Sequence, residues 1–222
     1  PETPMSWGAW IILSVYPVTG LFALAQLPAD LKDKLGRRIG WLPRLADWAA
    51  GRIRALAVGN VVLGIGLGLY TGVLLNLFPA RPLWNSALLP LIFLFSGLAC
   101  GSTCLLLMRV SEKENRLCGR LNAIFLGAQL LMILLWIVDL ATGGSSHGHA
   151  AGLILGGPYT AAFWTLVVAM GIAAPLAGEL ISLMRNSQAG RATAVFILAG
   201  AFSLRWIILF AGQHAEFIGA IH

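Results

Sequence analysis

Three ionisable side chains lie inside long apolar stretches of the sequence, where a charge is costly and therefore indicates a specific role. Asp139 and Arg205 fall in two such stretches, and their opposite charges make them candidate partners, either locking two helices together or serving a ligand site. Glu179 lies in a third stretch. It is a candidate proton carrier; the alternative is a carboxylate that hydrogen bonds to Asn60, Asn122 or an arginine.

Cysteines and histidines are few and poorly placed for redox chemistry. Haem in a helical bundle needs histidines at membrane depth, and iron–sulfur clusters need grouped cysteines. Both requirements fail, because the histidines fall in connections or the tail and the cysteines form no C-x-x-C pair: His147, His149, His214, His222, Cys100, Cys104 and Cys118. We therefore expect no haem, iron–sulfur cluster, bound metal or disulfide in this chain, and we expect the His147–His149 pair to be solvated in a Gly/Ser-rich loop.

The composition indicates that lipid, not water, surrounds most of the chain. Hydrophobic residues make up 58% of it and charged residues only 11%, against about 25% charged residues in soluble domains. The net charge of +6 does not indicate a nucleic-acid partner, because the Lys and Arg residues lie between apolar stretches and form no basic face on a soluble module. The sequence predicts an all-α integral membrane protein.

Six stretches have the roughly 20 apolar residues that a transmembrane helix needs. They predict one integral membrane domain over residues 1–222, with spans at about 6–27, 55–77, 86–108, 118–140, 159–184 and 192–212. In the longest connection, 28–54, apolar and basic residues recur at helical spacing, which favours an interfacial amphipathic segment at about 44–54. A solvated basic loop is the alternative.

The positions of Lys and Arg predict the orientation of these spans, because cytoplasmic connections are enriched in both. Alternate connections hold seven, four and two of them, which makes thirteen on one side, whereas the opposite side holds Arg81 alone. We therefore expect a multi-pass protein of the inner (cytoplasmic) membrane with both ends of this chain non-cytoplasmic.

Small residues recur every four positions in two of the spans. Gly64, Gly68 and Gly72 form one row, and Gly97 and Gly101 form another. Such rows let helix backbones approach closely in lipid. We therefore expect close helix packing along both rows.

Polar and aromatic residues gather at the predicted non-cytoplasmic ends of four spans. Tyr70, Trp84, Asn85 and Gln213 all fall there, beside helix-end glycines. Tryptophans alone would be ordinary interface anchors. Together with hydroxyl and amide groups, they could surround an apolar slot for a quinone, whose two ring oxygens accept hydrogen bonds and whose tail needs hydrocarbon.

Four ordered motifs at these positions resemble the NrfD/PsrC family, the membrane subunits of polysulfide reductase and related complexes. The resemblance covers essentially the whole chain, and the motifs are Pro4-Met5-Ser6-Trp7-Gly8-Ala9-Trp10, Tyr70-Thr71-Gly72-Val73-Leu74-Leu75, Arg81-Pro82-Leu83-Trp84-Asn85-Ser86, and Leu204-Arg205-Trp206 followed by Ala211-Gly212-Gln213.

The resemblance implies two four-helix bundles, with eight helices in the simplest members, and a reaction with menaquinone or ubiquinone. The six spans would match the last six of eight, so that the chain would be N-terminally incomplete. Tyr70 falls at the family's quinone-contacting tyrosine, whereas the family's other contacts, a His and an Asn, belong to a first helix outside this sequence. Trp84, Asn85 and Gln213 match family motifs, and their contact with quinone is our inference from shared depth.

The leading functional prediction is a membrane-anchor and quinone-reactive subunit that exchanges electrons with a partner. The resemblance implies a ferredoxin-like iron–sulfur partner and a catalytic subunit, often of the molybdopterin type, on the non-cytoplasmic face. It also implies proton movement in some members, for which Glu179 is the candidate. We expect this chain to be non-catalytic on its own, with no catalytic residues. The alternatives are a purely structural anchor with no quinone turnover, and a transporter, for which Pro17 and Pro175 give a weak signal of broken helices.

Overall fold

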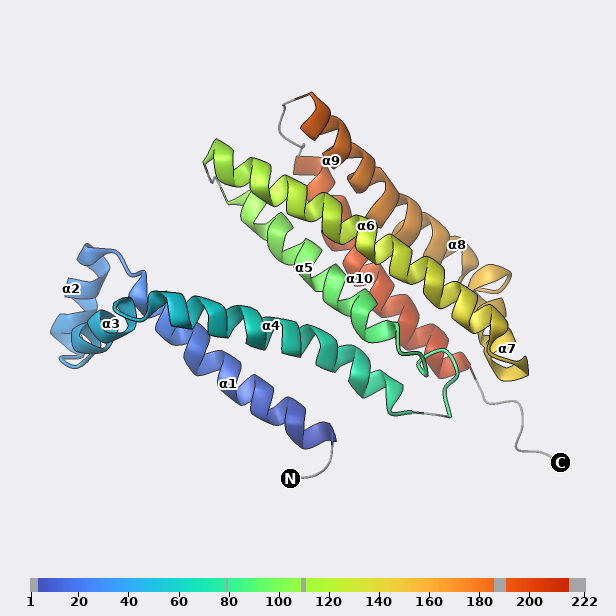
Figure 1. Cartoon of the computed structure of the whole chain (residues 1–222), viewed down its shortest axis with the longest axis horizontal. Coiled ribbons are helices and arrows are strands. Elements are labelled where there is room, and N and C mark those ends of the chain that lie inside the picture. The colour runs from blue at the N-terminus through green and yellow to red at the C-terminus, as the bar shows by residue number, and fades with distance from the viewer. Residues whose placement is uncertain (1–3, 79, 109–110, 186–190, 216–222) are drawn as a thin grey trace. The chain divides into compact units, whose positions relative to one another are not determined.

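A computed structural model describes residues 4–78, 80–108, 111–185 and 191–215, and the elements within them are helical (Figure 1). The bounds are α1 (Pro4–Ala25), α2 (Ala29–Arg38), α3 (Leu42–Ala50), α4 (Ile53–Asn76), α5 (Leu89–Leu107), α6 (Glu112–Thr142), α7 (Ser145–Leu155), α8 (Thr160–Ala162), the π-helix η1 (Phe163–Ala173), α9 (Ala174–Met184) and α10 (Arg191–His214). This confirms the predicted all-α class for the described residues.

Six segments among the described residues are long and apolar enough to cross a membrane, as predicted. They are Ser6–Ala25, Ile53–Asn76, Leu89–Leu107, Glu112–Thr142, Thr160–Met184 and Ala192–His214. The fourth begins six residues before the predicted start because Ser111 caps it. The Ser111 hydroxyl accepts from the Glu114 N–H, and the Glu114 carboxylate accepts from the Ser111 N–H at 2.9 Å. This capping box starts the helix in its polar flank, ahead of the apolar run.

The connection between the first two spans contains two helices, α2 and α3. The connection is therefore helical and not a loop, and the amphipathic segment is a helix at Leu42–Ala50, somewhat earlier than the predicted 44–54. Its interfacial position stays a prediction. One face of α3 is buried through Leu42, Ala46 and Ala49. The helix ends at Gly51 because a turn leads from there directly into α4.

The chain divides into two compact units, Pro1–Tyr70 and Thr71–His222, with the division inside α4. Unit 1 contains α1, α2, α3 and most of α4. Its two spans are joined through polar contacts: the Thr19 hydroxyl donates to the Asn60 side-chain oxygen at 2.6 Å, and the Asn60 amide donates to the Val18 carbonyl at 3.5 Å. In lipid, such contacts hold helices together because hydrocarbon offers no alternative partner.

Unit 2 contains a bundle of four spans, formed by α5, α6, α10 and the α8–η1–α9 segment (Figure 1). Each span packs against two neighbours, and the core between them is apolar. Fully buried residues from all four spans meet there: Ile92, Ile133, Phe163 and Leu204. This is the number of spans predicted for each half of the double four-helix bundle. The complete eight-helix arrangement stays a prediction.

The centre of the fifth span is a π-helix, which the sequence pattern did not indicate. Pro175 follows it and has no backbone N–H to donate to the preceding turn, so the backbone hydrogen-bonding pattern there differs from that of a regular α-helix. Gly171 in this region meets Gly200 of α10: a Cβ built on Gly200 would lie 2.2 Å from the Gly171 Cα. Only glycine at both positions allows the two backbones to lie so close.

The predicted rows of small residues behave differently from one another. Among the described residues, no heavy atom lies within 4 Å of a Cβ built on Gly64, Gly97 or Gly101. Gly72 does make a close approach, since its Cβ would lie 2.3 Å from the Pro90 Cα. Four-residue spacing therefore located the contact of Gly72 with Pro90 but not the equally close Gly171–Gly200 crossing.

The connection between the fourth and fifth spans is also structured. The predicted Gly/Ser-rich loop contains the helix α7, so His147 and His149 lie on a helix and not in a loop, and His149 is exposed. Gly144 precedes α7 with a φ of 96°, a left-handed conformation that favours glycine and turns the chain after α6. Ala150 and Ile154 then pack into the core of unit 2.

Candidate functional site

The loop before α5 packs against the last turns of α10 in unit 2. The Trp84 indole N–H donates to the Ile208 carbonyl at 2.8 Å, and the Arg81 guanidinium donates to the Gln213 carbonyl. Gly212 makes this possible, because a Cβ there would lie 1.8 Å from the Trp84 Nε1. Two segments about 130 residues apart in sequence are thus joined at one end of the bundle.

Three predicted site residues of this loop and of α10 therefore lie at the same end of unit 2, but they differ in what they offer a ligand. The Trp84 side chain is 9% exposed and its N–H is already hydrogen bonded. Asn85 and Gln213 are exposed. Trp84 accordingly holds the loop in place, whereas the two amides are the polar groups that face outward.

The same end of unit 2 contains polar contacts that the sequence did not indicate. The Tyr159 hydroxyl lies 3.0 Å from Nδ1 of His214, and the two rings are 5.9 Å apart. His214 is the last residue of α10, not part of a free tail. The sequence signal for this was that His214 follows Phe210 by four residues, a helical spacing, at the end of an apolar stretch.

Asp139 and Arg205 have different partners. Asp139 accepts from the Ser86 hydroxyl at 2.7 Å, which ties α6 to the start of α5. Arg205 donates to the Ser96 hydroxyl and to the Ala201 carbonyl, both at 3.0 Å, and its guanidinium lies 5.6 Å from the Phe93 ring. The predicted partnership is absent because Arg205 points toward α5, and charge alone gave no information on helix faces.

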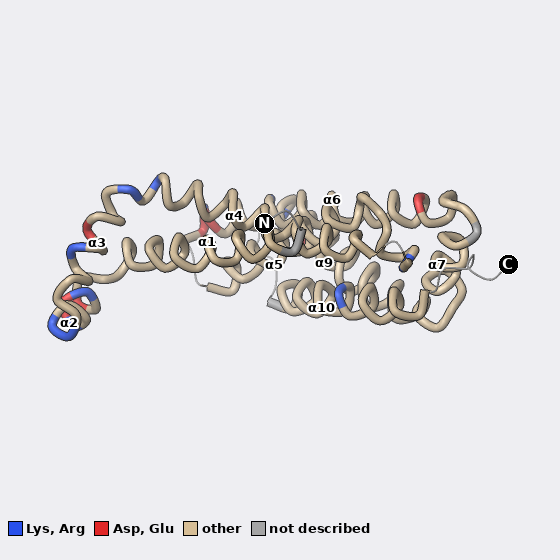
Figure 2. The backbone as a smooth tube through the Cα atoms, turned by 90° about the horizontal axis from the view of Figure 1, so that it is seen from below, with Lys and Arg blue, Asp and Glu red and all other residues tan. Residues whose placement is uncertain are grey.

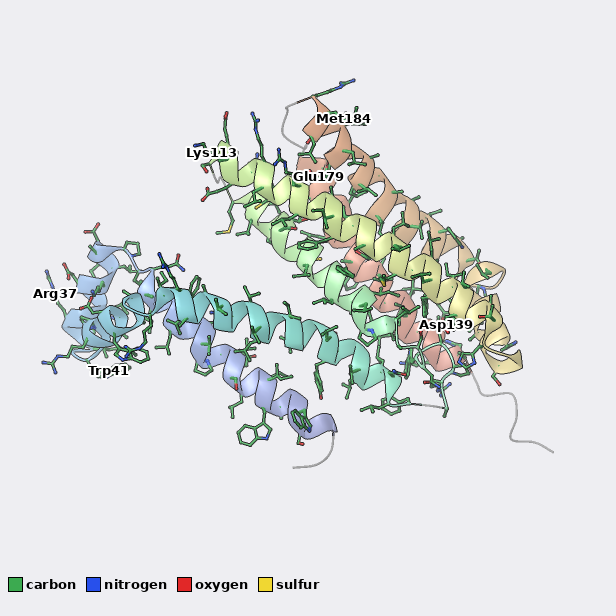
Figure 3. The ribbon with its side chains drawn as sticks, in the orientation of Figure 1. Arg37, Trp41, Lys113, Asp139, Glu179 and Met184 are labelled. Atoms are coloured by element: carbon green, nitrogen blue, oxygen red, sulfur yellow. The ribbon has the colours of Figure 1, made fainter. Side chains whose placement is uncertain are left out.

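Glu179 is almost fully buried, at 1% exposure, toward the opposite end of unit 2 from Asp139 (Figure 3). The Asn122 amide donates to its carboxylate at 3.4 Å, so Asn122 is the partner among the three alternatives considered. Asn122 is itself bonded to Ser102 at 2.7 Å and to Thr103 at 3.0 Å. Four buried polar side chains thus form one cluster between α5, α6 and α9.

Gly119 lies directly beside this cluster. A Cβ at that position would be 3.1 Å from the Glu179 carboxylate. The carboxylate thus lies against the backbone of α6, with amide and hydroxyl groups from two other residues on the neighbouring turn and on α5. A carboxyl group in such surroundings has hydrogen-bonding partners but no adjacent cation among these contacts, which suits a group that exchanges a proton.

Tyr70 lies in unit 1 and packs against α1. A Cβ built on Gly8 would lie 1.8 Å from Cζ of Tyr70 and 2.2 Å from its hydroxyl oxygen, so the ring occupies the space that glycine leaves. The neighbouring Trp7 and Trp10 are 68% and 64% exposed. Gly8 is therefore the residue that determines where the phenol lies.

Two buried polar atoms lack a hydrogen-bond partner within the described residues: Nε1 of Trp136 and the hydroxyl of Thr160. Trp136 is fully buried in the core of unit 2 and packs 6.4 Å from Phe163. In the same part of the chain, no three of the metal-ligating side chains His, Cys, Asp and Glu are grouped.

These features define a class: an all-α integral membrane protein whose described polar groups form buried clusters and helix-end contacts. The family described as "Polysulphide reductase, NrfD" matches residues 1–216. The chain belongs to this NrfD family.

Individual relatives agree with this assignment. The C chain of polysulfide reductase from Wolinella succinogenes is 31% identical over 97% of this sequence and 70% of its own length. Protein NrfD of Escherichia coli is 29% identical over 94% of this sequence and 70% of its own length. The C subunit of tetrathionate reductase from Salmonella typhimurium is 27% identical over 95% of this sequence and 58% of its own length.

Proposed function

We propose that the chain is the membrane-anchor and quinone-reactive subunit of a respiratory oxidoreductase complex. It would exchange electrons between a membrane quinone and an iron–sulfur subunit, which in turn would serve a catalytic subunit. Oxidation of a quinol releases two electrons and two protons, so the site must be close to an electron acceptor in a partner and to groups that accept protons. The names of the relatives, as single components of polysulfide and tetrathionate reductases, support a multi-subunit assembly.

The observation that carries this proposal is the pairing of Tyr70 with Gly8 in a member of the NrfD family. A phenol that packs in the gap left by glycine has a defined position, and its hydroxyl can donate a hydrogen bond to a quinone oxygen. Precise placement of such a donor matters because a shift of about 1 Å at a reacting group can cost about 100-fold in rate.

In unit 2, we assign the exposed amides of Asn85 and Gln213 as further candidate contacts. Trp84 takes a positioning role instead, since its N–H is held by the Ile208 carbonyl. Each of these assignments is independent of Tyr70.

Proton movement is the second part of the proposal, and Glu179 is its candidate residue. The cluster of Glu179, Asn122, Ser102 and Thr103 supports it, because amide and hydroxyl groups can stabilise either protonation state of a carboxyl group. The proposed non-cytoplasmic position of the ends rests on the Lys and Arg distribution, and the proposed docking of the partners on that face rests on the resemblance to the family.

The deciding experiment is Tyr70→Phe in the purified complex, assayed with quinol and separately with an artificial electron donor. Loss of one hydrogen bond, about 0.5–1.5 kcal/mol, should lower quinone-linked activity about 2- to 12-fold and leave the artificial-donor activity unchanged. Tyr16→Phe is the matched control, because the Tyr16 side chain is 74% exposed on α1. A purely structural anchor would respond to neither change, and that result would refute the proposal.

A further inference from the structure

The connection between α1 and α4 carries an exposed face of mixed aromatic and basic character in unit 1. Residues 29–54 include seven Lys or Arg and three Asp, a net charge of +4 out of the +6 of the whole chain. These charges gather on the end of unit 1 formed by α2 and α3 (Figure 2). Both ends of the connection continue into spans, so this segment lies at a membrane surface whichever way the protein is oriented.

The two helices form a fixed platform instead of a loose loop. Lys32 of α2 is paired with Asp47 of α3, and Gly36 lies against Pro43, where a Cβ would be 2.7 Å from the proline ring. The buried face of α3 packs on α1. The side chains on the other face of α3 are therefore held in a defined arrangement before any ligand binds.

That outward face alternates tryptophan with arginine. Trp41 and Trp48 are seven residues apart, two helical turns, and are 62% and 48% exposed. Arg44 is exposed on the adjoining side, and the Arg52 guanidinium lies 4.4 Å from the centre of the Trp48 ring. Figure 3 shows Trp41 and Arg37 at this end of unit 1.

A surface pocket of about 470 Å³ adjoins this face, at the junction of α3 and α4. It is lined by Gly51, Arg52, Ile53, Arg54 and Ala55. Two arginines at its wall suit a phosphate group, since guanidinium groups donate paired hydrogen bonds to phosphate oxygens. Tryptophan beside them suits the boundary between headgroups and acyl chains, where its ring has an apolar body and a polar N–H.

We propose that this platform binds the phosphodiester headgroup of an anionic phospholipid, with Arg52 and Arg54 as the phosphate ligands and with Trp41 and Trp48 in the interfacial layer. Charge complementarity favours lipid over a protein partner with an apolar face, because the exposed tryptophans are separated by cations. The proposal does not depend on quinone chemistry.

The test compares lipid binding by the intact complex in detergent, using native mass spectrometry with phosphatidylglycerol and with phosphatidylcholine of the same acyl chains. Wild type should prefer phosphatidylglycerol. The variant R52Q/R54Q should bind it about 30-fold more weakly, about fivefold for each basic side chain. Phosphatidylcholine, whose phosphodiester charge is offset by its quaternary ammonium, should lose less, so that the preference disappears. R52K/R54K keeps both charges and should retain the preference.

The matched control is K113Q/R120Q, which removes two exposed charges from the start of α6 and should keep the wild-type preference. Equal binding of the two lipids by wild type would overturn the proposal, as would an unchanged preference in R52Q/R54Q. A last measurement uses free glycerol phosphate as a competitor for the lipid. If it competes at the concentrations at which the lipid binds, the pocket takes free phosphate and the lipid assignment is wrong.

Discussion

The crossing of η1 and α10 in unit 2 offers a sharp test of the fold, through the variant Gly200→Ala. The added Cβ would lie 2.2 Å from the Gly171 Cα, whereas ordinary contact begins at 3.4 Å. The two backbones would have to separate by about 1.2 Å, the difference between those distances. Forcing an extra carbon into a packed contact of this kind costs about 1–3 kcal/mol.

Gly97→Ala provides the matched control for this perturbation. Gly97 is exposed on α5, and no described heavy atom lies within 4 Å of its Cβ position. Both substitutions gain the helix propensity of alanine over glycine, about 1 kcal/mol, so this term cancels between them. The difference in unfolding free energy between the two variants is then the overpacking cost alone, about 1–3 kcal/mol in favour of Gly97→Ala.

The assay is equilibrium unfolding in mixed micelles with increasing SDS, followed by the helical signal. A double variant, Gly171→Ala with Gly200→Ala, should cost clearly less than the sum of the single variants, because either alanine already separates the same two helices. If Gly200→Ala is as stable as Gly97→Ala, the close crossing does not exist and the packing of η1 described above is wrong.

Three further predictions concern individual side chains. Glu179→Gln should abolish proton movement across the membrane coupled to quinol oxidation in proteoliposomes while leaving the thermal midpoint nearly unchanged, since the amide can still hydrogen bond within the polar cluster. Unchanged proton movement would remove Glu179 from the proposal. Trp84→Phe should destabilise the protein by about 1 kcal/mol through loss of its hydrogen bond to α10, seen as a lower thermal midpoint than that of Trp206→Phe, whose side chain is 45% exposed. Gly8→Ala should lower quinone-linked activity at least as much as loss of the Tyr70 hydroxyl, because the methyl group displaces the ring. Gly20→Ala, with no described atom within 4 Å of the added Cβ, should have no effect. Equal activity of these two variants would show that the position of the phenol does not matter for its function.

The six spans were predictable from the sequence because membrane insertion depends on local hydropathy summed over about 20 residues. Their ends were less predictable, since capping and turn geometry fix them. Ser111 and Glu114 were visible as a capping box and would have placed the start of α6 correctly. The helix α7 was missed because glycine and serine next to His147 weigh against a helix locally, although Ala150 and Ile154 gain burial from the tertiary fold.

The candidate site depended on which face of each helix points inward, and sequence gives this only indirectly. The partners of Asp139 and Arg205 are hydroxyl groups of Ser86 and Ser96, which local pattern does not distinguish from any other serine. Tyr70 was found through resemblance to the family, and the glycine beneath it, Gly8, lies about 60 residues away in sequence. Such pairings arise from tertiary packing, so no window of local sequence contains them.

One inward face was readable, however, and it explains why Glu179 meets Asn122. Along α6 the buried positions from Asn122 onward are spaced three or four apart: Asn122, Leu126, Gln129, Ile133, Trp136 and Leu140. Asn122, Gln129 and Trp136 recur every seven residues, so all three lie on one side. Polar groups in a span turn toward protein because lipid cannot hydrogen bond to them. Two amides and an indole at this spacing therefore identify the face of α6 toward the bundle core, and the Glu179 carboxylate of α9 meets Asn122 on that face.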